Sequence, residues 1–140
     1  MKPGETKKIP LGLSFELPPG YVLYIMPRSG VSLKTKLRQP NSVGVIDSDY
    51  RGEVAMMFDN IASEGEENYV SLITGIDGKS ELDDTGSIYD EGTYLVRKGD
   101  RVCQGVIQKL PDISLVQVDV LSETDRGSGG FGSTGVNKND

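Results

Sequence analysis

Histidine and tryptophan are absent from this 140-residue sequence, and cysteine occurs once, at Cys103. Without histidine the chain cannot form a Ser-His-Asp triad, a Cys-His dyad, an HExxH metalloprotease site or a His-ligated zinc site. General base catalysis would therefore fall to a carboxylate, a lysine or a tyrosine. A single cysteine excludes an internal disulfide and fits the reducing cytoplasm, where we expect the protein to act. We expect Cys103 to be a small core residue, because no histidine is present to activate its thiol.

Long apolar runs are also missing. No stretch approaches the roughly 20 apolar residues that span a bilayer, and none follows Met1, so we expect neither a membrane helix nor a signal peptide. Hydrophobic residues make up 36% and charged residues 26% of the chain, which predicts one globular domain over residues 1–140.

The net charge of -6 is unevenly distributed. Residues 61–92 contain nine acidic residues and one basic residue, so the remainder is slightly basic. An acidic chain is a poor binder of duplex DNA, and we expect no direct contact with nucleic acid. A small phosphorylated ligand remains compatible with this balance. The acidic segment is either a solvated loop or a surface for a protein partner, and the charge pattern alone favours neither.

The abundance of turn residues, 18 Gly and 7 Pro, favours a β protein over a helical bundle. Short stretches of strand character predict an antiparallel all-β barrel or jelly roll: Tyr21–Met26, Val54–Phe58, Tyr94–Val96, Val102–Ile107 and Leu115–Leu121. One short helix is expected after Gly30, with Val31, Leu33 and Leu37 partly buried. The tail from Arg126 onward is rich in Gly, Ser and Asn, and by itself predicts disorder.

Three stretches contain residues suited to nucleotide chemistry. Pro27-Arg28-Ser29-Gly30 follows a predicted strand and offers a guanidinium and a hydroxyl to phosphate, although a plain surface turn has the same pattern. Residues 41–53 read as a hairpin that presents backbone groups to a base, or as one with only a charged tip; on a strand, Asp47 and Asp49 would share a face. Residues 99–104, GDRVCQ, predict a turn and a strand that carries Gln104.

The fourth stretch, residues 126–135, contains GxGxxG at Gly127, Gly129 and Gly132. It is not a dinucleotide-binding fingerprint, because that motif opens a helix within a βαβ unit and this one lies at the end of the sequence. It is not a Walker A motif either, since GK[ST] is absent. The stretch is suited to close over a nucleotide, with Phe131 stacking on a base and Arg126 contacting phosphate.

Together and in this order, the four stretches resemble the second to fifth motifs of the trimeric dUTP diphosphatases, or dUTPases. The resemblance extends from about Pro3 to Val136. It implies an antiparallel β jelly-roll-like barrel that assembles as a homotrimer with three shared active sites. It also implies hydrolysis of dUTP to dUMP and pyrophosphate with Mg²⁺, bound mainly through the substrate phosphates and water rather than by protein ligands. In a cell, this activity keeps uracil out of DNA.

The resemblance also assigns roles to individual residues. The phosphates would be held by Arg28, Ser29, Gly30 and Gln104. The uracil pocket would be formed by Asn41 and by the backbone of Val45 and Ile46. Asp47 would bind the 3′-hydroxyl and orient the attacking water. Tyr50 would pack against the deoxyribose and exclude a 2′-hydroxyl. An arm that closes from another subunit would contain Arg126, Phe131, Gly132, Ser133 and Thr134.

Two departures from the family pattern stand out. The first motif, of the type Ala-Gly-Tyr-Asp-Leu, is missing before Pro3, so we expect an abbreviated chain, a late start or a degraded paralogue. Residues 61–92 form an insertion between the third and fourth motifs, at a position where some phage members carry a partner-binding segment. Two alternatives follow: a weakened or regulatory relative that acts through its insertion, and a dCTP deaminase of the same fold, against which the tail and the IDSDYRG hairpin argue.

Overall fold

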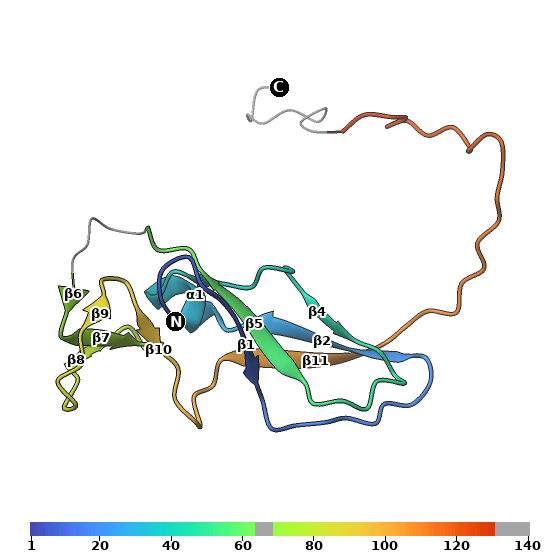
Figure 1. The fold of residues 1–140 in the computed structure, drawn as a ribbon. Coiled ribbons are helices and arrows are strands. Elements are labelled where there is room, and N and C mark those ends of the chain that lie inside the picture. Colours follow the sequence, from blue (N-terminus) through green and yellow to red (C-terminus); the bar gives the residue numbers. More distant parts are fainter. Residues whose placement is uncertain (64–68, 131–140) are drawn as a thin grey trace.

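The computed structural model describes residues 1–63 and 69–130. The described residues form eleven strands and one helix in the order β1 (Thr6–Pro10), β2 (Tyr21–Pro27), α1 (Ser29–Lys34), β3 (Leu37–Arg38), β4 (Gly44–Ile46), β5 (Ala55–Asn60), β6 (Tyr69–Val70), β7 (Leu72–Gly75), β8 (Ser80–Leu82), β9 (Tyr89–Asp90), β10 (Tyr94–Leu95) and β11 (Cys103–Lys109). The all-β prediction is confirmed (Figure 1).

Two antiparallel three-stranded sheets form the body, in the orders β11-β2-β4 and β1-β5-β3. Every second side chain of β5 is buried, which places Met56 and Phe58 in the core. They belong to one cluster with Leu23 and Ile25 of β2 and with Leu37 of β3. The two sheets are therefore joined by a shared apolar core.

The strands of the insertion form two small sheets beside this body, one of which also includes β10 from the chain directly after the insertion. One has the order β10-β7-β8, in which β7 and β10 are parallel, and the other pairs β6 with β9. Buried Asn60 closes the junction: its Nδ2 donates to the carbonyls of Met1 and Gly92, and its Oδ1 accepts from the N–H of Ala62. A polar side chain with all these partners is well accommodated in the interior.

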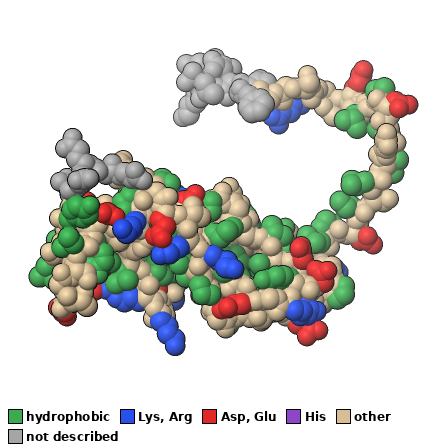
Figure 2. All heavy atoms as spheres, viewed as in Figure 1, with side chains coloured by type: hydrophobic (Ala, Val, Ile, Leu, Met, Phe, Trp, Pro, Cys, Tyr) green, Lys and Arg blue, Asp and Glu red, His purple; other side chains and the backbone are tan. Residues whose placement is uncertain are grey.

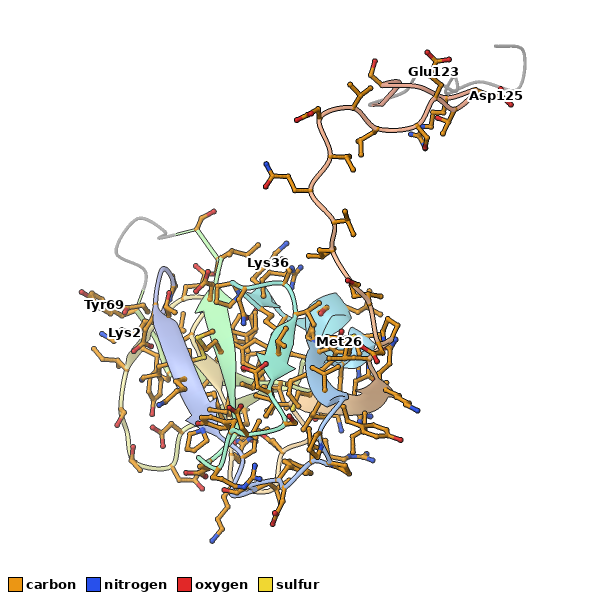
Figure 3. The ribbon with its side chains drawn as sticks, turned by 90° about the vertical axis from the view of Figure 1, so that its right-hand side faces the viewer. Lys2, Met26, Lys36, Tyr69, Glu123 and Asp125 are labelled. Atoms are coloured by element: carbon orange, nitrogen blue, oxygen red, sulfur yellow. The ribbon has the colours of Figure 1, made fainter. Side chains whose placement is uncertain are left out.

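The predicted strand Leu115–Leu121 is wrong for the single chain. After the Leu110 N–H, which donates to the Gly20 carbonyl at 2.8 Å, the backbone leaves the body, and residues 111–130 run away from it as an extended arm (Figures 1 and 3). Its alternating apolar side chains are exposed, with Val116 at 77% and Val120 at 83%. A strand needs a hydrogen-bonded neighbour, and within the described residues this segment has none.

The short helix predicted after Gly30 is confirmed, although it begins one residue earlier than Gly30, at Ser29, and its predicted apolar face is only partly right. Val31 is buried and Leu37 is fully buried on β3, whereas Leu33 is 85% exposed. A helix of six residues has little more than one turn, so only one position faces the core. Within residues 1–63 and 69–130, no helix is both long and apolar enough to cross a membrane.

Candidate active site

The central strand of one sheet brings three of the predicted motifs together. β2 pairs on one side with β11, which begins at Cys103 within GDRVCQ, and on the other with β4 of the 41–53 hairpin. β2 itself ends at Pro27, directly before Arg28. Residues that lie far apart in sequence therefore converge on one three-stranded sheet (Figure 1).

Arg28 marks the transition from strand to helix. Its backbone is extended, with φ -74° and ψ 138°, and its carbonyl accepts from the N–H groups of Val31 and Ser32 at 3.0 and 3.2 Å. Ser29 and Gly30 are exposed in the first turn. The sequence thus folds PRSG so that a half-buried arginine is followed at the end of β2 by an exposed hydroxyl and an exposed glycine backbone.

The strand with Gln104 runs beside this turn. Cys103 lies opposite Pro27 and Gln104 opposite Met26, and the Gln104 Nε2 donates to the Pro27 carbonyl at 3.4 Å. The preceding turn is closed by the Asp100 N–H donating to the Arg97 carbonyl at 3.1 Å. Burial raises the pKa of the Cys103 thiol, which disfavours the reactive thiolate and agrees with a packing role.

The hairpin presents an edge strand. Among residues 1–63 and 69–130, β4 pairs with β2 alone, so the backbone groups on its other edge are available to contact a ligand. Gly44 lies so close to β2 that a Cβ there would be 3.2 Å from the Ile25 Cβ. Asn41 and Val45 are exposed, and Ile46 is half-buried. The turn before β4 is held by the Val43 N–H donating to the Asn41 carbonyl at 2.6 Å.

Asp47 and Asp49 do not share a strand face, which corrects the expectation. β4 ends at Ile46, and residues 47–50 form a turn in which the Tyr50 N–H donates to the Asp47 carbonyl at 3.2 Å. Asp47 is exposed at the start of this turn. The Tyr50 ring folds back over Gly52, where a Cβ would lie 2.4 Å from the phenolic oxygen, and its hydroxyl donates to the Glu53 carbonyl at 3.1 Å. Gly52 is therefore required for this ring position.

Arg28 and Asp47 lie at opposite ends of the sheet within one chain. Ile46 pairs with Leu23, so the chain leaves β4 five residues before Arg28 along β2. At about 3.3 Å per strand residue, Arg28 and Ile46 are offset by about 16 Å along the strands, and Asp47 follows Ile46 at the far end of this offset. PRSG, the motif predicted to bind phosphate, and Asp47, the predicted catalytic carboxylate, are thus not adjacent in one chain.

The fourth predicted stretch is only partly described. Residues 124–129 form turns in which the Arg126 Nε donates to the Gly129 carbonyl at 2.8 Å. The predicted arm residues Phe131, Gly132, Ser133 and Thr134 lie outside the described residues.

Two polar residues that the sequence reasoning did not single out lie near these motifs. Gln39 donates from Nε2 to the Ile25 carbonyl at 3.2 Å, and this contact anchors the base of the hairpin. Lys34 lines a cleft together with Arg28 and Arg101. The signal for Lys34 was its place six residues beyond Arg28, on the short helix expected at PRSG.

Comparison with known proteins decides the family. The sequence model of the dUTPase family matches residues 1–65 and 88–135. The chain belongs to the dUTPase family. It is 38% identical over 136 residues to the deoxyuridine 5′-triphosphate nucleotidohydrolase of Caulobacter vibrioides, covering 97% of this chain and 70% of that protein. The corresponding protein of Finegoldia magna is also 38% identical, over 135 residues, covering 96% of this chain and 75% of that protein.

Solved structures agree with this assignment. The dUTPase of Staphylococcus bacteriophage 80alpha with dUPNHPP superposes with a TM-score of 0.89 at 32% identity, covering 97% of this chain and 79% of that one. The dUTPase from phage phi11 of S. aureus, in a structure that visualises its species-specific insert, gives a TM-score of 0.79 at 31% identity, over 89% and 78% of the two chains. The predicted family, dUTPase-like fold and dUTP diphosphatase activity of the family are confirmed.

Proposed function

We propose that this dUTPase hydrolyses dUTP to dUMP and pyrophosphate in a homotrimer whose active sites combine residues of different subunits. The observation that supports it most strongly is the sheet β11-β2-β4, which carries three family motifs on adjoining strands. Splitting a phosphoanhydride needs positioned donors and an aligned water more than covalent catalysis, and this donor set is suited to that chemistry. The single cysteine fits action in the cytoplasm.

The phosphates are bound at the end of β2. Arg28 contributes a planar guanidinium, Ser29 a hydroxyl, Gly30 an accessible backbone and Gln104 a carboxamide. Ser29, Gly30 and Gln104 are exposed and Arg28 is half-buried, and Gln104 donates to the carbonyl of Pro27 directly before Arg28; this placement at one end of the sheet supports the role.

The base and sugar are recognised by the hairpin. The free edge of β4, at Val45 and Ile46, has the backbone donors and acceptors that a uracil edge requires, and Asn41 lies at the turn before it. Tyr50, held over Gly52, packs against the deoxyribose and leaves no room for a 2′-hydroxyl. Asp47 binds the 3′-hydroxyl and accepts a proton from the attacking water as general base.

Magnesium fits this site as an ion bound through the substrate. Among the residues described, no group of three or more Asp, Glu, Cys or His side chains is arranged to hold a metal. Magnesium retains several waters and binds readily through phosphate oxygens, so the triphosphate and water supply its ligands in place of protein side chains. When bound, the ion neutralises phosphate charge; Arg28 and Gln104 then orient the chain of phosphates.

The separation of Arg28 from Asp47 supports a shared site. Arg28 and Ile46, the residue before Asp47, are offset by about 16 Å along the strands of one chain, too far for one group of reacting atoms. The arm supports assembly independently, because Leu115, Val116 and Val120 are exposed on a segment that stands away from the described part of the body (Figure 2). We infer that a second copy supplies the missing side, and that the Gly-rich arm closes over the nucleotide from another subunit.

Product analysis tests the proposal directly. The chain is incubated with dUTP, UTP and dCTP, with and without Mg²⁺, and products are separated by anion exchange. We expect dUMP and pyrophosphate from dUTP with Mg²⁺, and little turnover of the other two nucleotides. Release of ammonia from dCTP, or no turnover of dUTP at any protein concentration that yields trimers, would overturn it.

A regulatory function is the second candidate, and the insertion favours it. Residues 66–87 have no counterpart in the family model, and the insertion exposes apolar side chains on an acidic segment, among them Tyr69, Leu72 and Leu82. Leu72 and Leu82 lie directly opposite each other on β7 and β8. Such a patch suits a protein partner. Nucleotide binding without hydrolysis would support this candidate, and robust turnover would exclude it as the main function.

A further inference from the structure

The segment without a counterpart in the family model reaches the phosphate motif. β7 and β8 form an antiparallel hairpin whose turn is closed by the Gly78 N–H donating to the Gly75 carbonyl at 2.9 Å. A Cβ on Gly78 would lie 3.0 Å from the Lys34 Cβ and 3.5 Å from the Lys34 carbonyl oxygen. The turn therefore packs directly against the last residue of α1, the helix that begins at Ser29 (Figure 1).

The same hairpin is tied to the loop that leads into GDRVCQ. Glu81 of β8 forms an ion pair with the Arg97 guanidinium. On the neighbouring strand, a Cβ on Gly75 would lie 3.2 Å from the Arg97 Nη1. One hairpin thus contacts both chain segments that flank the phosphate motif.

Between these segments lies an open cleft of about 350 Å³. Its charged lining residues are Arg28, Lys34, Asp77, Asp100 and Arg101. Three are basic and two acidic, and Arg28 is the residue already proposed to hold phosphate. Lys34 is exposed and carries three N–H donors on a flexible stem, which is suited to a terminal phosphate.

Asp77 stands on the hairpin side of this cleft. Its Oδ1 accepts from the Lys79 N–H at 3.1 Å, which fixes the turn, while the carboxylate stays exposed. A negative charge at this place weakens the binding of a polyphosphate. An asparagine would keep the hydrogen-bond acceptor and remove the charge, together with the exposed ion pair between the Asp77 Oδ2 and the Lys79 Nζ at 3.9 Å.

We propose that Lys34 is a further phosphate-contact residue, and that the inserted turn Ile76–Gly78 is the outer wall that holds it at the polyphosphate end of the site. The inference rests on the proposed function, because it extends the phosphate site assigned to Arg28. It gives the insertion a part in substrate binding in addition to any partner.

The test is equilibrium binding by calorimetry with three probes: the non-hydrolysable α,β-imido analogue of dUTP, dUMP, and inorganic tripolyphosphate. Lys34→Gln is expected to raise the dissociation constants of the analogue and of tripolyphosphate about fivefold to tenfold and to leave that of dUMP unchanged. Gly78→Val, which displaces Lys34, is expected to act in the same direction. Asp77→Asn is expected to lower the dissociation constants of both polyphosphates about twofold to threefold at low salt.

Matched controls carry the same charge changes outside the cleft. Lys36→Gln removes an exposed lysine two residues away, and Asp84→Asn removes an exposed carboxylate of the insertion; neither lines the cleft. Both are expected to bind every probe as the unaltered chain does. The inference would be overturned if Lys34→Gln and Lys36→Gln changed polyphosphate affinity equally. It would also be overturned if Lys34→Gln weakened the binding of dUMP as much as that of the polyphosphates.

The two proposals fail separately. If the unaltered chain binds no uridine nucleotide, the proposed function is wrong, and tripolyphosphate still tests the cleft. If the analogue binds tightly but Lys34→Gln changes neither polyphosphate, the function stands and the role of Lys34 is wrong.

Discussion

Replacing Gly52 with alanine is predicted to separate substrate selectivity from stability. The new Cβ would lie 2.4 Å from the phenolic oxygen and 2.6 Å from the Cζ of Tyr50. Non-bonded carbon contacts need about 3.5 Å, so the ring must move by about 1 Å or more. The hydrogen bond from the Tyr50 hydroxyl to the Glu53 carbonyl is then lost, at a net cost of about 1 kcal/mol.

Stability should fall no further than that. Tyr50 is 44% exposed, so its ring can swing into solvent without leaving a cavity in the core. Selectivity should fall more, because a displaced ring no longer excludes the 2′-hydroxyl. We expect the ratio of kcat/KM for dUTP to that for UTP to drop about tenfold, which corresponds to about 1.4 kcal/mol.

The assay compares three proteins by steady-state kinetics and urea unfolding. Tyr50→Phe is the matched control, because it removes the same hydrogen bond but leaves the ring over Gly52. It should lose similar stability and keep its selectivity within about twofold. If Gly52→Ala keeps the selectivity of the unaltered chain, the position of Tyr50 over Gly52 does not determine sugar choice.

Three further predictions concern catalysis, packing and pH. Asp47→Asn should lower kcat at least about 100-fold with stability unchanged within about 0.5 kcal/mol, since Asp47 is exposed; near-normal turnover would contradict its role as base. Phe58→Ala should lower the free energy of unfolding in urea by about 3–5 kcal/mol, because Phe58 is fully buried; a loss below about 1 kcal/mol would contradict the described core. Hydrogen bonds from Tyr89 and Thr85 lower the pKa of Asp83 from 3.8 to about 2, so their stabilising contribution is present above pH 4 and is lost as the pH falls through about 2. The same bond raises the pKa of Tyr89, and Asp83→Asn should lower the pH of its ultraviolet phenol titration; an unchanged titration would contradict the bond.

The sequence predicted the strands whose apolar side chains pack into the core of the same chain. The short apolar runs Tyr21–Met26 and Val54–Phe58 were enough, since both strands contribute side chains to the same core. Leu115–Leu121 shows a regular alternation of apolar and polar residues, yet among the described residues it has no strand beside it. A pattern of period two records that one face is meant to be buried but does not identify what buries it.

The candidate site shows the same division. Motif order predicted that PRSG, the hairpin and GDRVCQ belong together, and β2 places them on one sheet. The contact between Gly78 and Lys34 was not predictable, because it depends on the parallel pairing of β7 with β10 across the insertion. The end of β4 before Asp47 was not predicted. Ser48 and Asp49 favour a turn and the preceding residues favour a strand, so the sequence does not fix the residue at which the strand ends.

The most direct test of the account is to mix two inactive variants. Asp47→Asn and Arg28→Gln are purified separately, unfolded together in equal amounts and refolded, and dUTP turnover is measured. If each site takes Asp47 from one subunit and Arg28 from another, random assembly leaves about one quarter of the sites intact, and about one quarter of the unaltered activity returns. If no activity returns while the mixture forms trimers, both residues act within one subunit, and the shared site is wrong.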